Sequence, residues 1–251
     1  MSPVLEAGAW GLLGGLALVL GALVAWCVQV PPKVTAGIMA FGAGVLVSAL
    51  AFDLMEEAAE TGGLVPALLG FLVGSVAYML ANIELARHGA RHRKRSRGQQ
   101  PSEADQSGSG AAIAVGALLD GIPESVVLGT SLLGGAGVST AVVVAVFLSN
   151  LPEGLSSAAG MKGAGRSARY VFGVWCSIAL ASGLSAAAGY AFLGGASPEL
   201  LAVITAVAAG AILTMLADTM IPEAFERAHA LTGLIMAVGF GLAFAVSRLG
   251  A

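Results

Sequence analysis

Long apolar runs separated by short polar breaks dominate the pattern of this chain. A membrane-spanning helix needs about 20 mostly apolar residues, and eight segments meet that length, at about 8–28, 34–57, 64–84, 111–133, 138–160, 168–193, 200–222 and 231–249. The runs do not alternate between apolar and polar residues, so a membrane β-barrel is not expected. The pattern predicts an all-α polytopic membrane protein in which residues 1–251 form a single transmembrane domain.

The composition narrows the function classes further. Hydrophobic residues make up 57% of the chain, charged residues only 11%, and the mean hydropathy is +0.88. Soluble domains carry about 25% charged residues, so a soluble enzyme, a nucleic-acid binder and a disordered chain are excluded. The 36 glycines fit close packing of transmembrane helices. The first run follows Glu6 instead of a basic lead-in, so it is expected to be a retained helix and not a signal peptide.

The basic residues predict the orientation. If all eight runs span the membrane, Arg248 lies on one face and the other eleven basic residues share the opposite face: Lys33, Arg87, Arg91, Arg93, Lys94, Arg95, Arg97, Lys162, Arg166, Arg169 and Arg227. Cytoplasmic connections carry an excess of Lys and Arg. We therefore expect a multi-pass protein of the plasma (inner) membrane with both termini outside.

The one long connection, residues 86–110, is expected to be a flexible basic cytoplasmic loop. His88 and His92 lie in its basic part. Two interpretations stay open for this part: a loop that handles metal, or a solvated basic segment beside anionic lipid. Cys27 and Cys176 lie in apolar runs and are expected to behave as small hydrophobes.

Three acids, Asp120, Glu124 and Glu153, fall near the middle of predicted spans. Each acid costs roughly 2.5–3.5 kcal/mol at the centre of a spanning helix on insertion scales. Asp120 and Glu124 are four residues apart, so they share one helix face, and Ser149 and Glu153 have the same relation on the next helix, with Asn150 beside them. The two helices run in opposite directions, and a rise of about 1.5 Å per residue puts both groups near the midplane. The spacing predicts a cavity lined by oxygen ligands.

A proline accompanies each group of acids. Pro123 and Pro152 lack an N–H group and free the carbonyls of Leu119 and Leu148. A freed carbonyl inside a membrane must find protein, water or an ion. The alternative is a pair of hinge kinks with protonated acids that are merely hydrogen-bonded.

Acids also cluster where two other predicted spans end. Residues 52–58 (FDLMEEA) close the second run and residues 218–224 (DTMIPEA) close the seventh, on helices of opposite direction. Inverted repeats around a midplane site are typical of secondary transporters. We expect Asp53, Glu56 and Glu57 to concentrate cations at an outer entrance and Asp218 and Glu223 to do so at an inner exit, the alternative being ordinary solvation at the interface.

These motifs resemble the ZIP (Zrt/Irt-like) family of divalent metal transporters across nearly the whole chain. Residues 41–46 (FGAGVL) look like the family's entry into its second helix, residues 150–154 (NLPEG) look like its HNxPEG motif, and residues 120–124 (DGIPE) look like its HNxP(D/E) motif. The resemblance implies eight helices with an inverted pseudo-repeat and alternating access. It also implies movement of zinc, iron, manganese or cadmium toward the cytosol through a site between the fourth and fifth helices.

The departures from the family pattern change the expected metal chemistry. Asp120 and Ser149 stand where the family usually has His, Glu124 and Glu153 stand at its acidic positions, and Asn150 stands at its Asn/Asp position. These five residues are the predicted metal ligands, and all offer oxygen, which suits Mn²⁺ or Mg²⁺ better than imidazole-rich sites do. Residues 168–193 contain no acid for a second metal, so one ion is expected.

Competing interpretations come from other function classes. An intramembrane aspartyl protease would use Asp120 and Asp218, but its usual Tyr-Asp and Gly-x-Gly-Asp motifs do not occur. A non-transporting metal sensor or structural relative would bind metal without moving it. The main expectation is a transporter and not an enzyme, with divalent metal ions and lipid as partners, a homodimer as one arrangement, no tightly bound cofactor and no nucleic-acid partner.

Overall fold

The computed structural model describes residues 2–94, 100–102, 105–106, 108–134 and 140–249, and every regular element in those ranges is a helix. Eight helices are long and apolar enough to cross a membrane, which confirms the predicted all-α polytopic class. The elements are α1 (Pro3–Cys27), α2 (Pro32–Ala49), η1 (Leu50–Met55), α3 (Glu56–Gly62), α4 (Leu64–Arg87), η2 (Ala90–His92), α5 (Ser109–Ser131), η3 (Leu132–Gly134), α6 (Thr140–Gly163), α7 (Ala168–Leu193), α8 (Pro198–Met215), η4 (Leu216–Met220), α9 (Ile221–Ala228) and α10 (Leu231–Leu249).

The predicted spans match these helices to within a few residues, and the main differences are extensions. The second span continues through η1 and α3 to Gly62, and the seventh continues through η4 and α9 to Ala228. The predicted start of the fifth span at 138 lies outside the described residues. Serine side chains cap three helix starts, since Ser2, Ser167 and Ser197 each accept a hydrogen bond from the backbone N–H three residues later.

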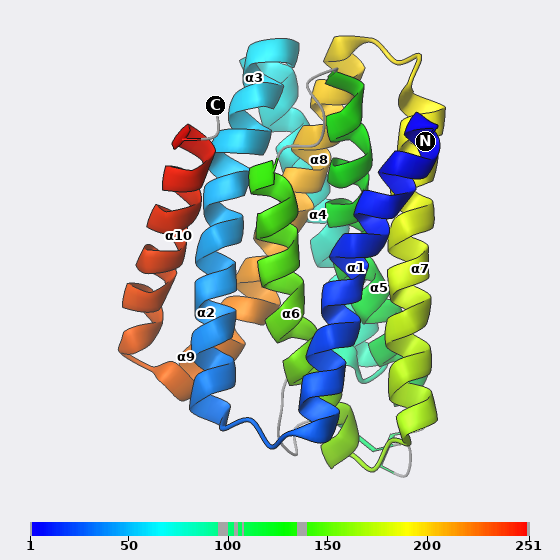
Figure 1. Ribbon diagram of the computed structural model, residues 1–251, viewed down its shortest axis with the longest axis vertical. Helices are drawn as coiled ribbons and strands as arrows, with labels where there is room; N and C mark the ends of the chain where they lie inside the picture. The colour runs from blue at the N-terminus through cyan, green and yellow to red at the C-terminus, as the bar shows by residue number, and fades with distance from the viewer. Residues whose placement is uncertain (1, 95–99, 103–104, 107, 135–139, 250–251) are drawn as a thin grey trace.

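Both chain termini lie at the same end of the molecule (Figure 1). The connections 28–31, 164–167 and 229–230 and the described residues of the connection between α4 and α5 lie at the opposite end, which we call the connector end; the end with the termini is the terminal end. A single residue, Gly63, joins α3 to α4 at the terminal end, and its φ of 85° is one that glycine adopts readily. The connections that carry the basic residues therefore lie at one end of the helix bundle, as their assignment to one membrane face requires.

The long helices form two groups (Figure 1). One consists of α1, α5, α6 and α7, and the other consists of α2, α4, α8 and α10. Backbones touch within each group: a Cβ at Gly21 of α1 would overlap the Leu151 carbonyl oxygen of α6, and one at Gly44 of α2 would overlap the Met236 carbonyl oxygen of α10. Across the boundary, Gly42 of α2 faces the Leu148 carbonyl oxygen of α6 less tightly, at 3.0 Å from the position of a Cβ. The closest backbone packing is therefore inside the groups.

Two helices of opposite direction contain π-helical segments at corresponding places. In the second span, η1 carries Asp53 near the terminal end, and in the seventh span, η4 carries Asp218 near the connector end. A short α-helix follows each segment. This correspondence fits the inverted repeat expected from the two acidic sequences.

Candidate functional site

Two of the predicted ligands, Asp120 of α5 and Glu153 of α6, meet around one positive charge. Their side chains are 1% and 4% exposed. The Nζ atom of Lys94 lies 3.3 Å from Asp120 Oδ2 and 2.8 Å from Glu153 Oε2. The two antiparallel helices therefore bring their carboxylates to the same level, as the sequence spacing predicted, and a lysine from the long connection lies between them.

Arg93 completes the contacts of Asp120. Its Nε donates to Asp120 Oδ2 at 3.0 Å and its Nη2 donates to Asp120 Oδ1 at 2.8 Å, which is the two-pronged geometry of strong arginine–carboxylate pairs. The Tyr78 hydroxyl of α4 also donates to Asp120 and accepts from Arg93 Nη2 at 2.8 Å, and Asn82 Oδ1 accepts from Arg93 Nη1 at 2.8 Å. Burial opposes the charged form of Arg93, but Asp120, Tyr78 and Glu153 together outweigh burial and raise the pKa of Arg93, so its guanidinium stays charged.

The connection after α4 returns into the helix bundle to deliver these two cations. Gly89 adopts a φ of 97°, the short helix η2 follows, and Ala90 is fully buried. Gly116 of α5 leaves room for the arginine, because a Cβ there would lie 2.5 Å from Arg93 Cδ. The geometry makes Gly116 the place where the arginine side chain passes α5.

The backbone beside the cations is also held. The Ser156 hydroxyl of α6 donates to the Lys94 carbonyl. Gln100 Nε2 donates to the Arg93 carbonyl at 2.8 Å and to the Ser157 carbonyl at 3.1 Å. Polar groups of α6 and of the connection itself thus fix the position of Arg93 and Lys94.

This arrangement bears on one of the two interpretations of the basic part of residues 86–110. A solvated basic segment beside lipid would expose Arg93 and Lys94, whereas their side chains are 2% and 3% exposed. Buried carboxylates without partners are costly, and two tethered cations remove much of that cost. Arg95 and Arg97 lie outside the described residues. His88 contacts Glu84 at 3.2 Å on the surface.

Glu124, the third membrane acid, lies on the terminal side of the cation pair. It is 2% exposed, and the Asn150 side chain of α6 lies beside its carboxylate. It borders a small cavity of about 10 Å³ whose other lining residues are apolar: Leu46, Ala49, Leu50, Leu54, Val127, Val142, Ala145, Val146 and Ile212. All nine of these apolar residues belong to one hydrophobic core, to which both helix groups contribute. Apolar side chains therefore close the site toward the terminal end.

Ser149 and Asn150, the remaining predicted ligands, are buried near the acids but bond to the backbone. Ser149 Oγ donates to the Val146 carbonyl at 2.9 Å, and Asn150 Nδ2 donates to the Gly14 carbonyl of α1 at 3.0 Å. Within the part of the chain that the structure describes, no three His, Cys, Asp or Glu side chains are grouped as metal ligands. In this conformation, Lys94 takes the position between Asp120 and Glu153.

The predicted entrance acids lie at the terminal end, away from the buried carboxylates. Asp53 accepts a hydrogen bond from Ser247 at 2.9 Å, and Glu56 lies 3.5 Å from Arg248 at the end of α10. Glu57 is exposed. These acids form a partly neutralised group at the surface.

The predicted exit acids are closer to the cation pair. Asn82, which accepts from Arg93, donates from its Nδ2 to Asp218 Oδ2 at 3.1 Å. Ser156, which donates to the Lys94 carbonyl, is 3.4 Å from Glu223 Oε1. The structure thus links the exit acids to the membrane acids through Arg93 and Lys94.

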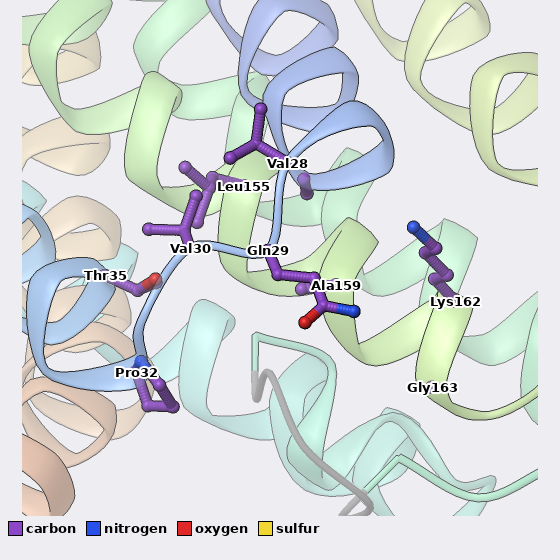
Figure 2. A pocket seen from close by; sticks show the side chains of 10 residues that line it. Val28, Gln29, Val30, Pro32, Thr35, Leu155, Ala159, Lys162 and Gly163 are labelled. Atoms are coloured by element: carbon purple, nitrogen blue, oxygen red, sulfur yellow. The ribbon is translucent and has the colours of Figure 1, made fainter.

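A separate cavity of about 340 Å³ opens at the connector end, where the α1–α2 connection crosses α6. Figure 2 shows Val28, Gln29 and Val30 of that connection beside Leu155 and Ala159. Lys162 at its edge donates to the Trp26 carbonyl at 2.8 Å. These lining residues do not include the buried acids, so this cavity is not part of the carboxylate site.

Cys27 and Cys176 are exposed free cysteines, so no disulfide joins them.

Sequence reasoning missed the side chains that surround the acids. Ser75, Tyr78 and Asn82 follow one another at helical spacing in a very apolar span, and this polar stripe was a readable signal for the face of α4 that meets Asp120. Arg93 and Lys94 had no such signal, because they stand in a run with four other basic residues. Gln100 and Ser156 likewise carry no recognisable pattern.

No family model matches the chain, and a search of the curated proteins finds no similar sequence.

Proposed function

We propose that this protein is a divalent metal cation transporter that moves Zn²⁺, or a related ion such as Mn²⁺, Fe²⁺ or Cd²⁺, toward the cytoplasm. The observation that carries the proposal is the position of Lys94 Nζ, 3.3 Å and 2.8 Å from two carboxylates of neighbouring helices. A buried place that holds an ammonium between two carboxylates has the charge and the oxygen donors that a divalent cation requires. Glu124 supplies a further carboxylate beside it.

The arrangement of the helices supports alternating access as the mechanism. Asp120, Glu124 and Glu153 all lie on α5 and α6, which belong to one helix group, while the second group covers them with Tyr78, Leu46 and Ile212. Displacement of one group relative to the other would open the site to either end in turn. The resemblance to the ZIP family implies the same class of cargo and mechanism.

The donor set bears on which metal is carried. Carboxylates, a hydroxyl and an amide are hard oxygen donors, whereas the imidazoles that favour zinc are absent from the five predicted ligands. We therefore expect weaker preference for Zn²⁺ over Mn²⁺ than a histidine-bearing site would have. The plasma membrane is the proposed location, with the connector end in the cytoplasm.

Uptake by purified protein in liposomes tests the proposal with Zn²⁺, Mn²⁺, Fe²⁺, Cd²⁺, Co²⁺ and Mg²⁺. We expect uptake of at least one of the first four ions, and at least a tenfold loss in Glu124→Gln and in Glu153→Gln. Glu60→Gln is the matched control, because Glu60 is exposed in α3 and makes no contact with the site. Equal uptake by the native protein and both site variants would contradict the proposal.

A second function is favoured by the same ion pairs. Because Arg93 and Lys94 already neutralise two carboxylates, the protein could be a membrane sensor that binds a metal without moving it. Metal binding without uptake for the whole panel of ions would assign this function in place of transport.

A further inference from the structure

We propose that Arg93 and Lys94 act as a tethered cation pair that fills the carboxylate site in the absence of metal, and that a divalent cation must displace this pair to bind. The inference rests on the proposed function because it concerns the same site. It adds a specificity and control element that lies in the connection between α4 and α5 and not in the helices that carry the ligands.

Charge balance is the first argument. Asp120 and Glu153 contribute two formal negative charges to a buried site, and Arg93 and Lys94 contribute two positive charges. A divalent cation that replaces the pair leaves the buried charge unchanged, whereas a monovalent cation would leave one carboxylate without compensation. Uncompensated charge is costly in a low-dielectric interior. The exchange therefore favours divalent over monovalent ions.

The position of the ammonium is the second argument. Lys94 Nζ contacts both carboxylates at once, so an ion coordinated by Asp120 and Glu153 together would have to occupy the same space. Arg93 uses both oxygens of Asp120. Metal and cation pair are thus mutually exclusive at these two acids.

The third argument is that the surrounding residues hold the pair in place. Gly116 provides the space for Arg93, Ser156 binds the Lys94 carbonyl, and Gln100 binds the Arg93 carbonyl. The segment is therefore bound at its backbone as well as through its charges. The acids Asp218 and Glu223 lie one hydrogen-bonded group beyond the pair, so displaced cations have carboxylates nearby at the connector end.

Amine labelling provides a direct test, because the chain contains only three lysines, Lys33, Lys94 and Lys162. Lys33 and Lys162 are exposed and serve as internal controls, whereas Lys94 is buried. The purified native protein is labelled with an acetylating reagent with and without Mn²⁺ or Zn²⁺, and with K⁺ at equal ionic strength, and each lysine is followed by mass spectrometry. We expect Lys94 to react at least tenfold faster with the divalent ions only.

Two labelling results would overturn the inference. Lys94 could react as fast as Lys33 without metal, which would mean that it does not occupy the site. It could also stay protected at a Mn²⁺ or Zn²⁺ concentration that saturates binding or uptake, which would mean that metal does not displace it. The second result would leave the proposed transport intact, so the two failures can be told apart.

A matched pair of glutamine variants tests the control role without removing a charge. Gln100→Ala loses the hydrogen bonds to the Arg93 and Ser157 carbonyls but keeps both cations and all three membrane acids. Gln106→Ala is the control, because Gln106 contacts the Arg87 carbonyl in the same connection and not the site. We expect the dissociation constant for Mn²⁺ to fall at least threefold in Gln100→Ala and to stay unchanged in Gln106→Ala. Equal constants in all three proteins would contradict the inference.

Gly116→Val gives an independent displacement of Arg93, since the added side chain would meet Arg93 Cδ. It should also tighten Mn²⁺ binding by at least threefold in protein that elutes as a single species on size exclusion. If Gly116→Val fails to fold, Gln100→Ala and the labelling of native protein still decide the question. If no divalent ion binds the native protein or Gln100→Ala, the proposed function is wrong and this inference falls with it.

Discussion

The buried acids are closed off in two different ways. Toward the terminal end, Glu124 faces apolar side chains of both helix groups, including Leu50 and Ile212. Toward the connector end, Asp120 and Glu153 are closed by Arg93 and Lys94. The apolar closure can open only if helices separate, because its contacts are between helices, whereas the ionic closure can be opened by exchange of one set of positive charges for another. The acids are buried to a similar extent on the two sides, but the two sides open in different ways.

The largest effect should follow from breaking the ionic closure. Arg93→Met leaves Asp120 without its two-pronged partner, and loss of one member of a buried pair costs about 3–5 kcal/mol of folding free energy. Unfolding in detergent, followed by loss of helical circular dichroism, measures the change. Arg87→Met is the control, because Arg87 and Glu84 form an exposed pair whose attraction is screened by solvent. Equal losses in the two variants would mean that the ionic closure is no stronger than a surface pair.

The apolar closure should respond to lost volume. Ile212→Ala removes side-chain atoms from the lining beside Glu124 and should cost about 2–5 kcal/mol, with faster reaction of Glu124 with a hydrophobic carbodiimide. Leu184→Ala is the control, since Leu184 is 71% exposed and faces away from the core. Mass spectrometry of the labelled protein reads the reaction. An unchanged rate in Ile212→Ala would show that Ile212 does not shield Glu124.

A partly exposed ion pair at the terminal end gives a reference value for the folding free energies of the two closures. Glu56→Gln removes the contact with Arg248 at 3.5 Å, where both side chains are about half exposed, and should change folding free energy by only about 0–1 kcal/mol. The same unfolding measurement in detergent tests this value, with Glu60→Gln as the matched loss of one exposed acid. A cost as large as that of Arg93→Met would remove the distinction between buried and surface charge.

The smallest effect concerns an exposed part of the connection that also carries the buried cations. Ser102 donates to Asp105 from its hydroxyl at 2.6 Å and from its backbone N–H, and these hydrogen bonds lower the pKa of Asp105 below its ordinary value. The associated stability is present above the ordinary pKa and is lost as pH falls through the lowered one. In Ser102→Ala the pKa of Asp105 should rise, measured by NMR titration of the carboxyl carbon. Metal binding at pH 7 should not change, because Asp105 is ionised in both proteins.

The sequence predicted the features that depend on regular helices. Eight long apolar runs were enough for the helix count, and four-residue spacing with opposite helix directions was enough to bring Asp120 and Glu153 together. Rise per residue and membrane thickness are nearly constant, so depth can be counted along the chain. The prediction that the basic connections share one side of the bundle followed from the same counting of helices.

Features that depend on irregular backbone could not be predicted in this way. Which basic residues of the long connection enter the bundle depends on a missing Cβ at Gly116 and a hydroxyl at Ser156, both far away in sequence. Ser149 stays a predicted metal ligand, but its hydrogen bond was not predicted: the hydroxyl donates to a carbonyl of the preceding turn, that of Val146, and its oxygen lone pairs remain available. Hydrogen bonds of this kind, between a side chain and the backbone of its own helix, decide where the side chain points after the position of the helix is fixed.

The π-helical segments in the second and seventh spans have a consequence for the register of the acids that follow them. A π-helical turn accommodates an extra residue, and one extra residue rotates everything beyond it by about 100° around the helix axis. In the second span this rotation is part of what directs Glu56 toward Arg248. Deleting a single residue from Leu50–Met55 would return the span to an unbroken α-helix with the acidic end still on the same face. Closing the π-helical turn without a deletion would instead rotate the acidic end by about 100°. The facing of each acidic end is therefore set by whether the π-helical turn keeps its extra residue.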